Sequence, residues 1–315
     1  MPERNDEKFV RDALGRLPVE QAPDSIWHSI QTSIDASLDA PARVPARPLF
    51  WPRSRWAFAA AAAVLIAGIA IYWRSANRPR WEVKLTSAGK TSQEAVRAGD
   101  WLQTDASSTA EVRVGTIGTV EVSPRTRLRI VTTRPDEHRI SLQHGQIKAT
   151  ISAPPRLFFV DTKSATAVDL GCQYTMNVDD YGNGLLNVTL GWVAFEWRGR
   201  ESLVPAGAQC RTHANAGPGT PYFEDAPKAF INALEDFDFS NGGEASVRTM
   251  LVSARQRDTL TLWHLLSRVA PPLRAQVFDK MTSFAPLPKG LTREKVLALD
   301  PPTLETWKNE LAWTW

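Results

Sequence analysis

The chain has 315 residues, of which 23% are charged and 43% are hydrophobic, and its formal net charge is +3. This length is enough for two domains, and the composition is ordinary for globular parts. A net charge this small does not indicate the strongly basic surface that nucleic-acid binding requires, so direct nucleic-acid binding is not expected.

Residues 1–39 are predicted to form a short segment with two amphipathic helices. The first helical pattern ends at Pro18, and Asp24 with Ser25 can cap the second. Two helices of this length cannot bury a core by themselves, so their apolar stripes need a partner. An excess of acidic residues over residues 1–40 could favour a basic partner or could simply be a solvated surface. The candidate partner-binding residues are Trp27, Ile30 and Ile34 on the second helix.

A proline- and arginine-rich linker, residues 40–55, leads to an uncharged run between two tryptophans. A helix over 56–73 would be roughly 27 Å long, close to the ~30 Å hydrocarbon core of a bilayer. A cleaved signal peptide would begin near the first residue, whereas this run begins far into the chain. We therefore predict one transmembrane helix over 56–73. The residues expected at the membrane interface are Trp56, Trp73, Arg55 and Arg74.

Beyond this helix the apolar period changes from 3.6 to 2, which predicts an all-β domain over 82–215. Many short alternating runs separated by turn signals are typical of a sandwich or roll. His144 and Gly145 are predicted to form a turn between two strands. One run alternates without a break and predicts a single long strand; its apolar residues are Val168, Leu170, Cys172, Tyr174, Met176 and Val178.

From residue 226 to residue 315 the pattern is helical again, and we predict an α-helical C-terminal region. Its apolar stripes imply that the helices pack on one another or on the β domain. The residues that carry the stripes are Phe230, Ile231, Leu234 and Phe237; Leu260, Leu262, Trp263, Leu265, Leu266 and Val269; Val277, Phe278 and Met281; and Leu304, Trp307 and Leu311.

The chain offers little catalytic chemistry. No nucleophile elbow is visible, and Cys210 with His213 supplies only half of a zinc site, so we expect no enzyme, no metal and no cofactor. Asp179 and Asp180 lie before a glycine-rich turn and are expected to form that turn. The two cysteines, Cys172 and Cys210, are either joined by a disulfide or are two buried thiols; the sequence leaves both alternatives open.

Seven short blocks of the β segment follow one another in a distinctive order. They are residues 99–104, 110–114, 142–147, 158–162, 168–174, 188–193 and 204–207. With these blocks the β segment, from about residue 81 to residue 214, resembles a FecR domain, the extracytoplasmic module of bacterial membrane regulators. Its glycines at 145, 191 and 207 fit positions where the backbone needs a positive φ.

The N-terminal segment, with Leu17-Pro18 and Pro23 to Trp27, resembles segments of membrane-bound anti-sigma factors. Two departures limit what this implies. The zinc motif of one anti-sigma class is absent, and the usual Gly-Thr pair of the FecR pattern is Gly171-Cys172, so a role in ferric citrate signalling is not implied.

The resemblance implies a single-pass protein of the bacterial inner membrane, with residues 1–55 cytoplasmic and the β domain and helical region periplasmic. Its expected partners are a sigma factor inside, an extracytoplasmic protein or envelope ligand outside, and the lipid bilayer. Positive charge flanks the predicted span on both sides and does not decide the orientation. The alternative is a membrane-tethered structural or ligand-binding module without regulatory activity.

Overall fold

The structure, a computed structural model, describes residues 79–315. The predicted N-terminal helices, the linker over 40–55 and the transmembrane helix over 56–73 lie outside the described residues. Among residues 79–315, no helix is both long enough and apolar enough to cross a membrane.

Alternating apolar residues build a mainly β domain followed by a helical part, as predicted. The strands are β1 (Trp81–Ser87), β2 (Lys90–Val96), β3 (Trp101–Gln103), β4 (Thr109–Val114), β5 (Gly118–Val122), β6 (Arg127–Arg134), β7 (Glu137–Ile151), β8 (Phe158–Asp161), β9 (Thr166–Asp169), β10 (Gln173–Val178), β11 (Gly184–Leu190), β12 (Trp192–Trp197), β13 (Arg200–Pro205), β14 (Ala208–His213), β15 (Gly217–Pro218) and β16 (Tyr222–Phe223).

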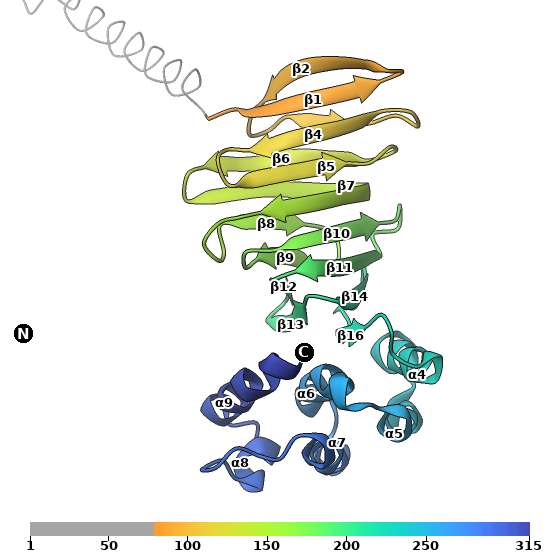
Figure 1. The fold of residues 1–315 in the computed structure, drawn as a ribbon. Coiled ribbons are helices and arrows are strands. Elements are labelled where there is room, and N and C mark those ends of the chain that lie inside the picture. Colours follow the sequence, from red (N-terminus) through yellow and green to blue (C-terminus); the bar gives the residue numbers. More distant parts are fainter. Residues whose placement is uncertain (1–78) are drawn as a thin grey trace, which may run out of the picture. The chain divides into compact units, whose positions relative to one another are not determined.

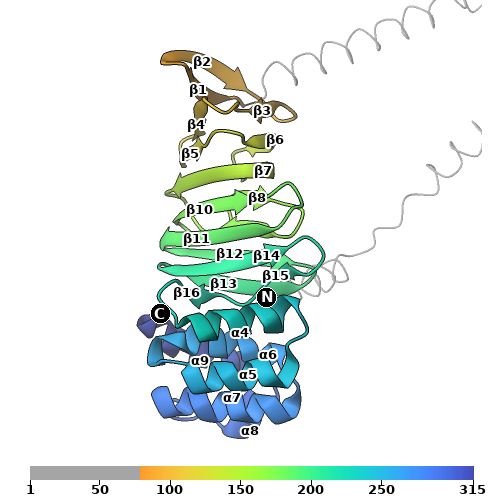
Figure 2. The ribbon, with the colours of Figure 1, turned by 90° about the vertical axis from the view of Figure 1, so that its right-hand side faces the viewer.

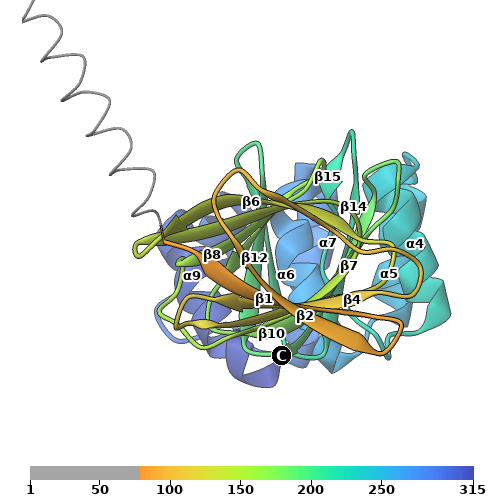
Figure 3. The same ribbon diagram turned by 90° about the horizontal axis from the view of Figure 1, so that it is seen from above.

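The strands form two sheets that share β7. Sheet A has the order β2-β1-β4-β5-β7-β10-β11-β14, with β15 and β16 paired to β14. Sheet B has the order β3-β6-β7-β8-β9-β12-β13. Among the strand pairs of residues 79–315, only β7–β8 is parallel. Seen from above, β6 of sheet B and β4 of sheet A lie on opposite sides (Figure 3). One hydrophobic core, with residues such as Ile140, Val112 and Tyr174, fills the space between the sheets.

Gly145 marks the point where β7 passes from one sheet to the other. Residues before it pair with β6 in sheet B, and residues after it pair with β5 and β10 in sheet A. Its φ is +97°, and a Cβ at this position would lie 2.4 Å from the Cα of Thr126. The prediction of a turn at His144-Gly145 was therefore wrong, because a positive-φ glycine can redirect a strand without ending it.

The predicted unbroken strand over 168–178 is divided. β9 ends at Asp169 in sheet B and β10 begins at Gln173 in sheet A, so the intervening residues form a corner between the sheets. Gly171, with φ +86°, makes this corner. Alternation continued across it because Cys172 remains buried on the core side, and a periodicity of 2 alone cannot detect a corner of this kind.

Helices form at each predicted apolar stripe, and two further helices, α5 and α8, were not predicted. The helices are α4 (Lys228–Phe239), α5 (Gly243–Ser253), α6 (Thr259–Arg268), α7 (Pro271–Phe284), α8 (Arg293–Leu297) and α9 (Pro301–Leu311), with short 3-10 turns η1 (Gln256–Asp258) and η2 (Ala312–Thr314). They bury a second core around Phe230, Leu265 and Trp307. Trp315 packs against both this core and that of the β domain.

The helices lie at one end of the β domain, next to β13 and β16, while β1 and β2 lie at the other end (Figures 1 and 2). α6 covers the edge strand β13, where the Leu203 N–H donates to Nε2 of His264 at 3.0 Å. A buried ion pair, Arg268 with Asp238 at 3.5 Å, lies beside this contact. Arg268 also donates to the Ser202 hydroxyl in β13 at 2.7 Å. The helical part therefore satisfies the polar groups of a strand edge that would otherwise be open.

Candidate functional site: a polar groove on sheet A

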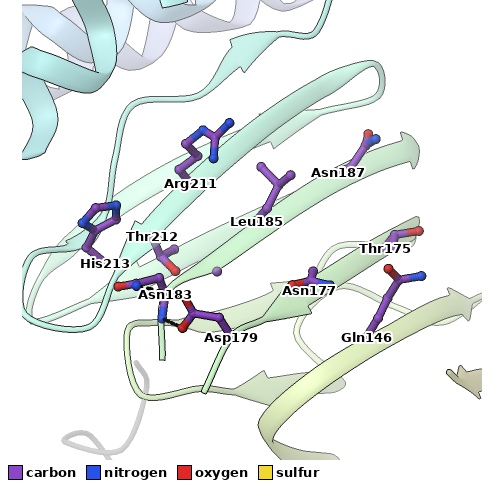
Figure 4. Close-up of a pocket in the computed structure, with 11 residues that line it drawn as sticks. Gln146, Thr175, Asn177, Asp179, Asn183, Leu185, Asn187, Arg211, Thr212 and His213 are labelled. Atoms are coloured by element: carbon purple, nitrogen blue, oxygen red, sulfur yellow. Dashed lines mark hydrogen bonds between the residues drawn. The ribbon is translucent and has the colours of Figure 1, made fainter. Parts of the chain in front are cut away.

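A groove of about 500 Å³ lies on the outer face of sheet A, where β10, β11 and β14 run side by side (Figure 4). Strand alternation places apolar residues such as Met176 and Leu186 in the core and leaves polar residues on this face. The polar side chains that line the groove include Gln146, Thr175, Asn177, Asn187, Arg211 and His213.

Strand register arranges these side chains in rows across the sheet. Asn177 pairs with Gln146 of β7 and with Leu185 of β11, and Leu185 pairs with Arg211 of β14. In the next row, Thr175 pairs with Asn187. Directly paired residues on one face have Cβ atoms about 5 Å apart, so amides from separate strands face one ligand together.

The Asp179–Asn183 turn closes one end of the groove. The Asp179 carboxylate accepts from the backbone N–H groups of Tyr181 at 2.9 Å and Asn183 at 2.8 Å, and from the Asn183 side-chain amide at 2.9 Å. Desolvation acts to raise the pKa of Asp179, but these hydrogen bonds outweigh it and lower the pKa below its ordinary value. Asp179 is therefore an ionised turn-former and not a proton donor, which agrees with the prediction from the sequence.

β14 and the helical part border the groove beside this turn. The His213 ring stacks on Phe239 of α4, with ring centres 4.0 Å apart and an angle of 6° between the planes. The Ala214 N–H donates to the Asn183 side chain at 3.3 Å, which ties the turn to the end of β14. At Gly184, a Cβ would lie 2.8 Å from the Thr212 hydroxyl, so a side chain there would press on the groove floor.

This arrangement suits non-covalent recognition. Amides and a hydroxyl supply neutral donors and acceptors, and Arg211 adds one cation among them. Within residues 79–315, no group of three or more His, Cys, Asp or Glu side chains is placed to hold a metal ion. The groove therefore presents neutral hydrogen-bonding groups and one guanidinium on the outer face of the sheet.

Both cysteines are free and buried in the structure. Cys210 pairs with Leu186, and Leu186 pairs with Met176 of β10. Cys172 directly precedes β10 and lies four residues before Met176 in the chain. Two strand spacings and four residues separate the cysteine Cα atoms by roughly 16 Å, whereas a disulfide requires less than about 7 Å. In the structure Cys172 and Cys210 are therefore two separate buried thiols.

Each thiol has its own environment. The Cys172 thiol donates to the Asp169 carboxylate at 2.6 Å, and the other carboxylate oxygen accepts the Gly171 N–H at 2.7 Å. Burial, followed by the charge of Asp169, raises the pKa of Cys172 well above its ordinary value. Burial likewise raises the pKa of Cys210 to about 12. Both groups stay protonated at neutral pH, so neither is an activated nucleophile.

Of the residues predicted to carry function, Trp27, Ile30 and Ile34 and the membrane-interface residues Trp56, Trp73, Arg55 and Arg74 lie outside the described residues. Sequence reasoning named Asp179 but missed the rest of the groove. Asn177 and Arg211 are far apart in the chain and meet only through the pairing of β10, β11 and β14.

Residues 100–193 match the sequence profile of a known protein family. The sequence profile described as "FecR protein" matches these residues. The match runs from β3 to the first residues of β12 and includes the β7, β10 and β11 parts of the groove. The resemblance to FecR proteins is thus confirmed for this part of the chain. A comparison with curated proteins finds no match.

Two crystal structures are similar to the chain, at 1.65 and 2.50 Å resolution, both of a "putative anti-sigma factor" from Parabacteroides distasonis ATCC 8503. Each has a TM-score of 0.36 and 16% sequence identity. The similarity covers 42% of this chain and 63% of that chain, so it spans less than two thirds of that protein.

Proposed function

We propose that the chain is a single-pass regulator of the bacterial inner membrane that controls a sigma factor in response to an extracytoplasmic signal. The observation that carries the proposal is the FecR match over residues 100–193, which lies within the β domain and contributes most of the groove. In this proposal residues 1–55 are cytoplasmic, residues 56–73 span the membrane, and the described part is periplasmic.

The proposed signal is a protein segment or an envelope polymer that binds the groove on sheet A. Its rows of amides offer donors and acceptors at the spacing of adjacent strands, and the groove lies open on the sheet surface (Figure 4). Regulation then requires that the liganded state outside changes the affinity of the N-terminal segment for the sigma factor.

Affinity purification from the native host tests the inner half of the proposal. The full-length chain is extracted from membranes and the proteins retained with it are identified by mass spectrometry. We expect a sigma factor to be retained by the wild type and lost from the Trp27→Ala/Ile30→Ala variant. Trp313→Ala is the matched control, because Trp313 is 90% exposed on the opposite side of the predicted span and should not affect retention.

The second candidate is a tethered module that binds an envelope ligand without regulating transcription. Deletion of residues 1–40 distinguishes the two candidates. Under the regulatory proposal this deletion alters the expression of genes that depend on the sigma factor, whereas under the tethered-module proposal expression does not change. Failure to recover a sigma factor from cells that produce all of them would favour the tethered module.

A further inference from the structure

β3 and β6 of sheet B lie at the end of the β domain opposite the helices (Figure 2). Their outward side chains form an aromatic and cationic surface. Trp101 of β3 is 44% exposed and pairs with Arg129 of β6. The guanidinium carbons of Arg127 and Arg129 lie 4.5 and 5.7 Å from the centre of the Trp101 ring. Val131 continues this exposed side of β6 and is 39% exposed. We call Trp101, Arg127, Arg129 and Val131 the tryptophan–arginine patch.

The cations of the patch are not neutralised by any residue that the structure describes. Neither Arg127 nor Arg129 has a carboxylate within 4.0 Å in this part of the chain, whereas Arg113, Arg134 and Arg139 of the same domain each form an ion pair. Nε of Arg127 is buried without a hydrogen-bond partner among the described residues. Two guanidinium groups that share one indole ring and have no anion nearby form a site with unused capacity for anionic groups.

The acidic residues nearest to Trp101 in the chain are already engaged. The Asp100 carboxylate accepts the Arg97 N–H at 2.8 Å, which closes the turn before β3. The Asp105 carboxylate accepts from Ser107 and Ser108, and these hydrogen bonds lower the pKa of Asp105 to about 2. These carboxylates serve their own turns. The hydrogen bond that Arg129 donates among the described residues goes from its Nε to the neutral Gly99 carbonyl at 3.3 Å.

The start of the described chain contacts β6, the strand that carries most of the patch. The Thr133 hydroxyl of β6 donates to the Pro79 carbonyl at 3.0 Å, so the chain enters the β domain on the patch strand. Arg129 lies four residues along β6 from Thr133, about 13 Å away. Six residues from Trp73 to Pro79 can span at most about 20 Å. If the helix over 56–73 is in the membrane, these two lengths keep Arg129 within roughly 35 Å of the bilayer surface.

We propose that the tryptophan–arginine patch docks the β domain onto anionic phospholipid headgroups of the bilayer that anchors the chain. This proposal rests on the membrane anchor of the proposed function. An indole ring favours the membrane–water interface, and a guanidinium group matches the geometry of a phosphate. The groove lies on the outer face of sheet A and the patch on that of sheet B, so docking leaves the groove accessible to its ligand.

The test places the full-length chain in lipid nanodiscs and follows a nitroxide spin label at Gln103→Cys in β3, beside Trp101. The native cysteines are buried and do not compete for the label. Discs of phosphatidylcholine alone are compared with discs that also contain phosphatidylglycerol, and docking is measured as reduced collision of the label with a water-soluble nickel chelate. A label at Val252→Cys, at an 86% exposed position on α5, is the control for the far end.

We expect protection of the Gln103→Cys label only in discs with phosphatidylglycerol, reversal by high salt, and no protection at Val252→Cys. The Arg127→Gln/Arg129→Gln variant should lower the ratio of docked to undocked protein about 30-fold, since each arginine contributes about 1 kcal/mol at an anionic surface. Arg127→Lys/Arg129→Lys retains the charge and should retain most of the protection.

Equal protection in both kinds of disc, or protection that survives the glutamine substitutions, would overturn lipid docking. Protection that increases with the number of chains per disc, whatever the lipid, would identify contact with a second copy and also overturn it. Anchoring is measured separately, as retention of the chain by phosphatidylcholine discs. Loss of retention refutes the anchor and the docking that rests on it; retention without dependence on phosphatidylglycerol refutes the docking alone.

Discussion

The contact between His264 and the edge of β13 predicts a specific pH dependence of stability. The Leu203 N–H can only donate, so Nε2 of His264 must accept this hydrogen bond and the ring hydrogen must be on Nδ1, which faces the Leu260 carbonyl at 2.9 Å. Protonation would place a second N–H against that of Leu203. Burial, followed by the positive charge of Arg268, lowers the pKa of His264 to about 3. Lys308 adds a further cation on the side of α9.

The sign of the effect follows from the two pKa values. In the unfolded chain the histidine titrates near 6.5, so between pH 6.5 and about pH 3 the unfolded state binds a proton that the folded state does not. Stability is therefore lost as the pH falls through 6.5 and continues to fall until about pH 3. At pH 5 the chain is 1.5 units below the unfolded pKa, and at 1.36 kcal/mol per unit this group costs about 2 kcal/mol relative to pH 7.

Urea unfolding of a fragment of residues 79–315 at pH 7 and pH 5 measures this loss. Gln at position 264 can still accept the Leu203 N–H through its carbonyl but does not titrate, so His264→Gln should lose about 2 kcal/mol less than the wild type between the two pH values. His144→Gln is the matched control, because His144 is 35% exposed and carries no such contact with an edge strand. Equal losses for the wild type and His264→Gln would refute the reasoning.

Three further predictions concern stability and the thiols. Gly145→Ala should destabilise the β domain by more than about 3 kcal/mol in urea unfolding, because the added Cβ would meet the Thr126 backbone. Gly99→Ala is the control: Gly99 has a φ of +104° and open space around it, so the substitution should cost only about 1–2 kcal/mol of backbone strain. Equal losses of stability in the two variants would contradict the predicted clash at Gly145. Arg268→Met should lower the free energy of unfolding by about 3–5 kcal/mol, because it leaves Asp238 buried without its partner. Arg293→Met breaks the exposed ion pair with Asp279 and should lower it by less than about 1 kcal/mol. Similar decreases in the two variants would refute the role of burial. A thiol reagent that cannot reduce disulfides should label Cys172 and Cys210 only after unfolding. Failure of the unfolded chain, isolated from its native host without a reductant, to react would indicate that the two are bonded in the cell.

The sequence predicted the fold class and most of the individual strands, because half-buried strands show their alternation directly. It failed where a strand changes sheets. At Gly145 a glycine that resembles a turn lies inside β7, and at Gly171 a corner keeps the alternation of a continuous strand. Both errors have the same physical origin, since periodicity reports which side of a strand is buried and not which sheet the strand belongs to.

The groove was largely invisible to the same reasoning. Thr175, Asn177 and Asn187 each occupy an ordinary outward position in an alternating strand, and nothing local distinguishes them from solvated residues. Their juxtaposition depends on the register of β10 with β11, which the sequence does not specify without the structure. Asp179 could be identified because its role is local: it accepts hydrogen bonds from residues within its own turn.

The two ends of the β domain protect their strand edges by different means, and this difference indicates where recognition can occur. At β13 the outward N–H of Leu203 is paired with His264, so α6 occupies the position that an added strand would take. At the other end β2 pairs only with β1 among the described residues, and its exposed Lys90 and Glu94 disfavour the addition of another strand. With β13 covered and β2 charged, the addition of a further strand is disfavoured at these two edges. The outer faces remain, and they carry different chemistry: neutral amides with Arg211 on sheet A, and Trp101 with two arginines on sheet B. A ligand on one face and a membrane on the other could therefore be engaged at the same time.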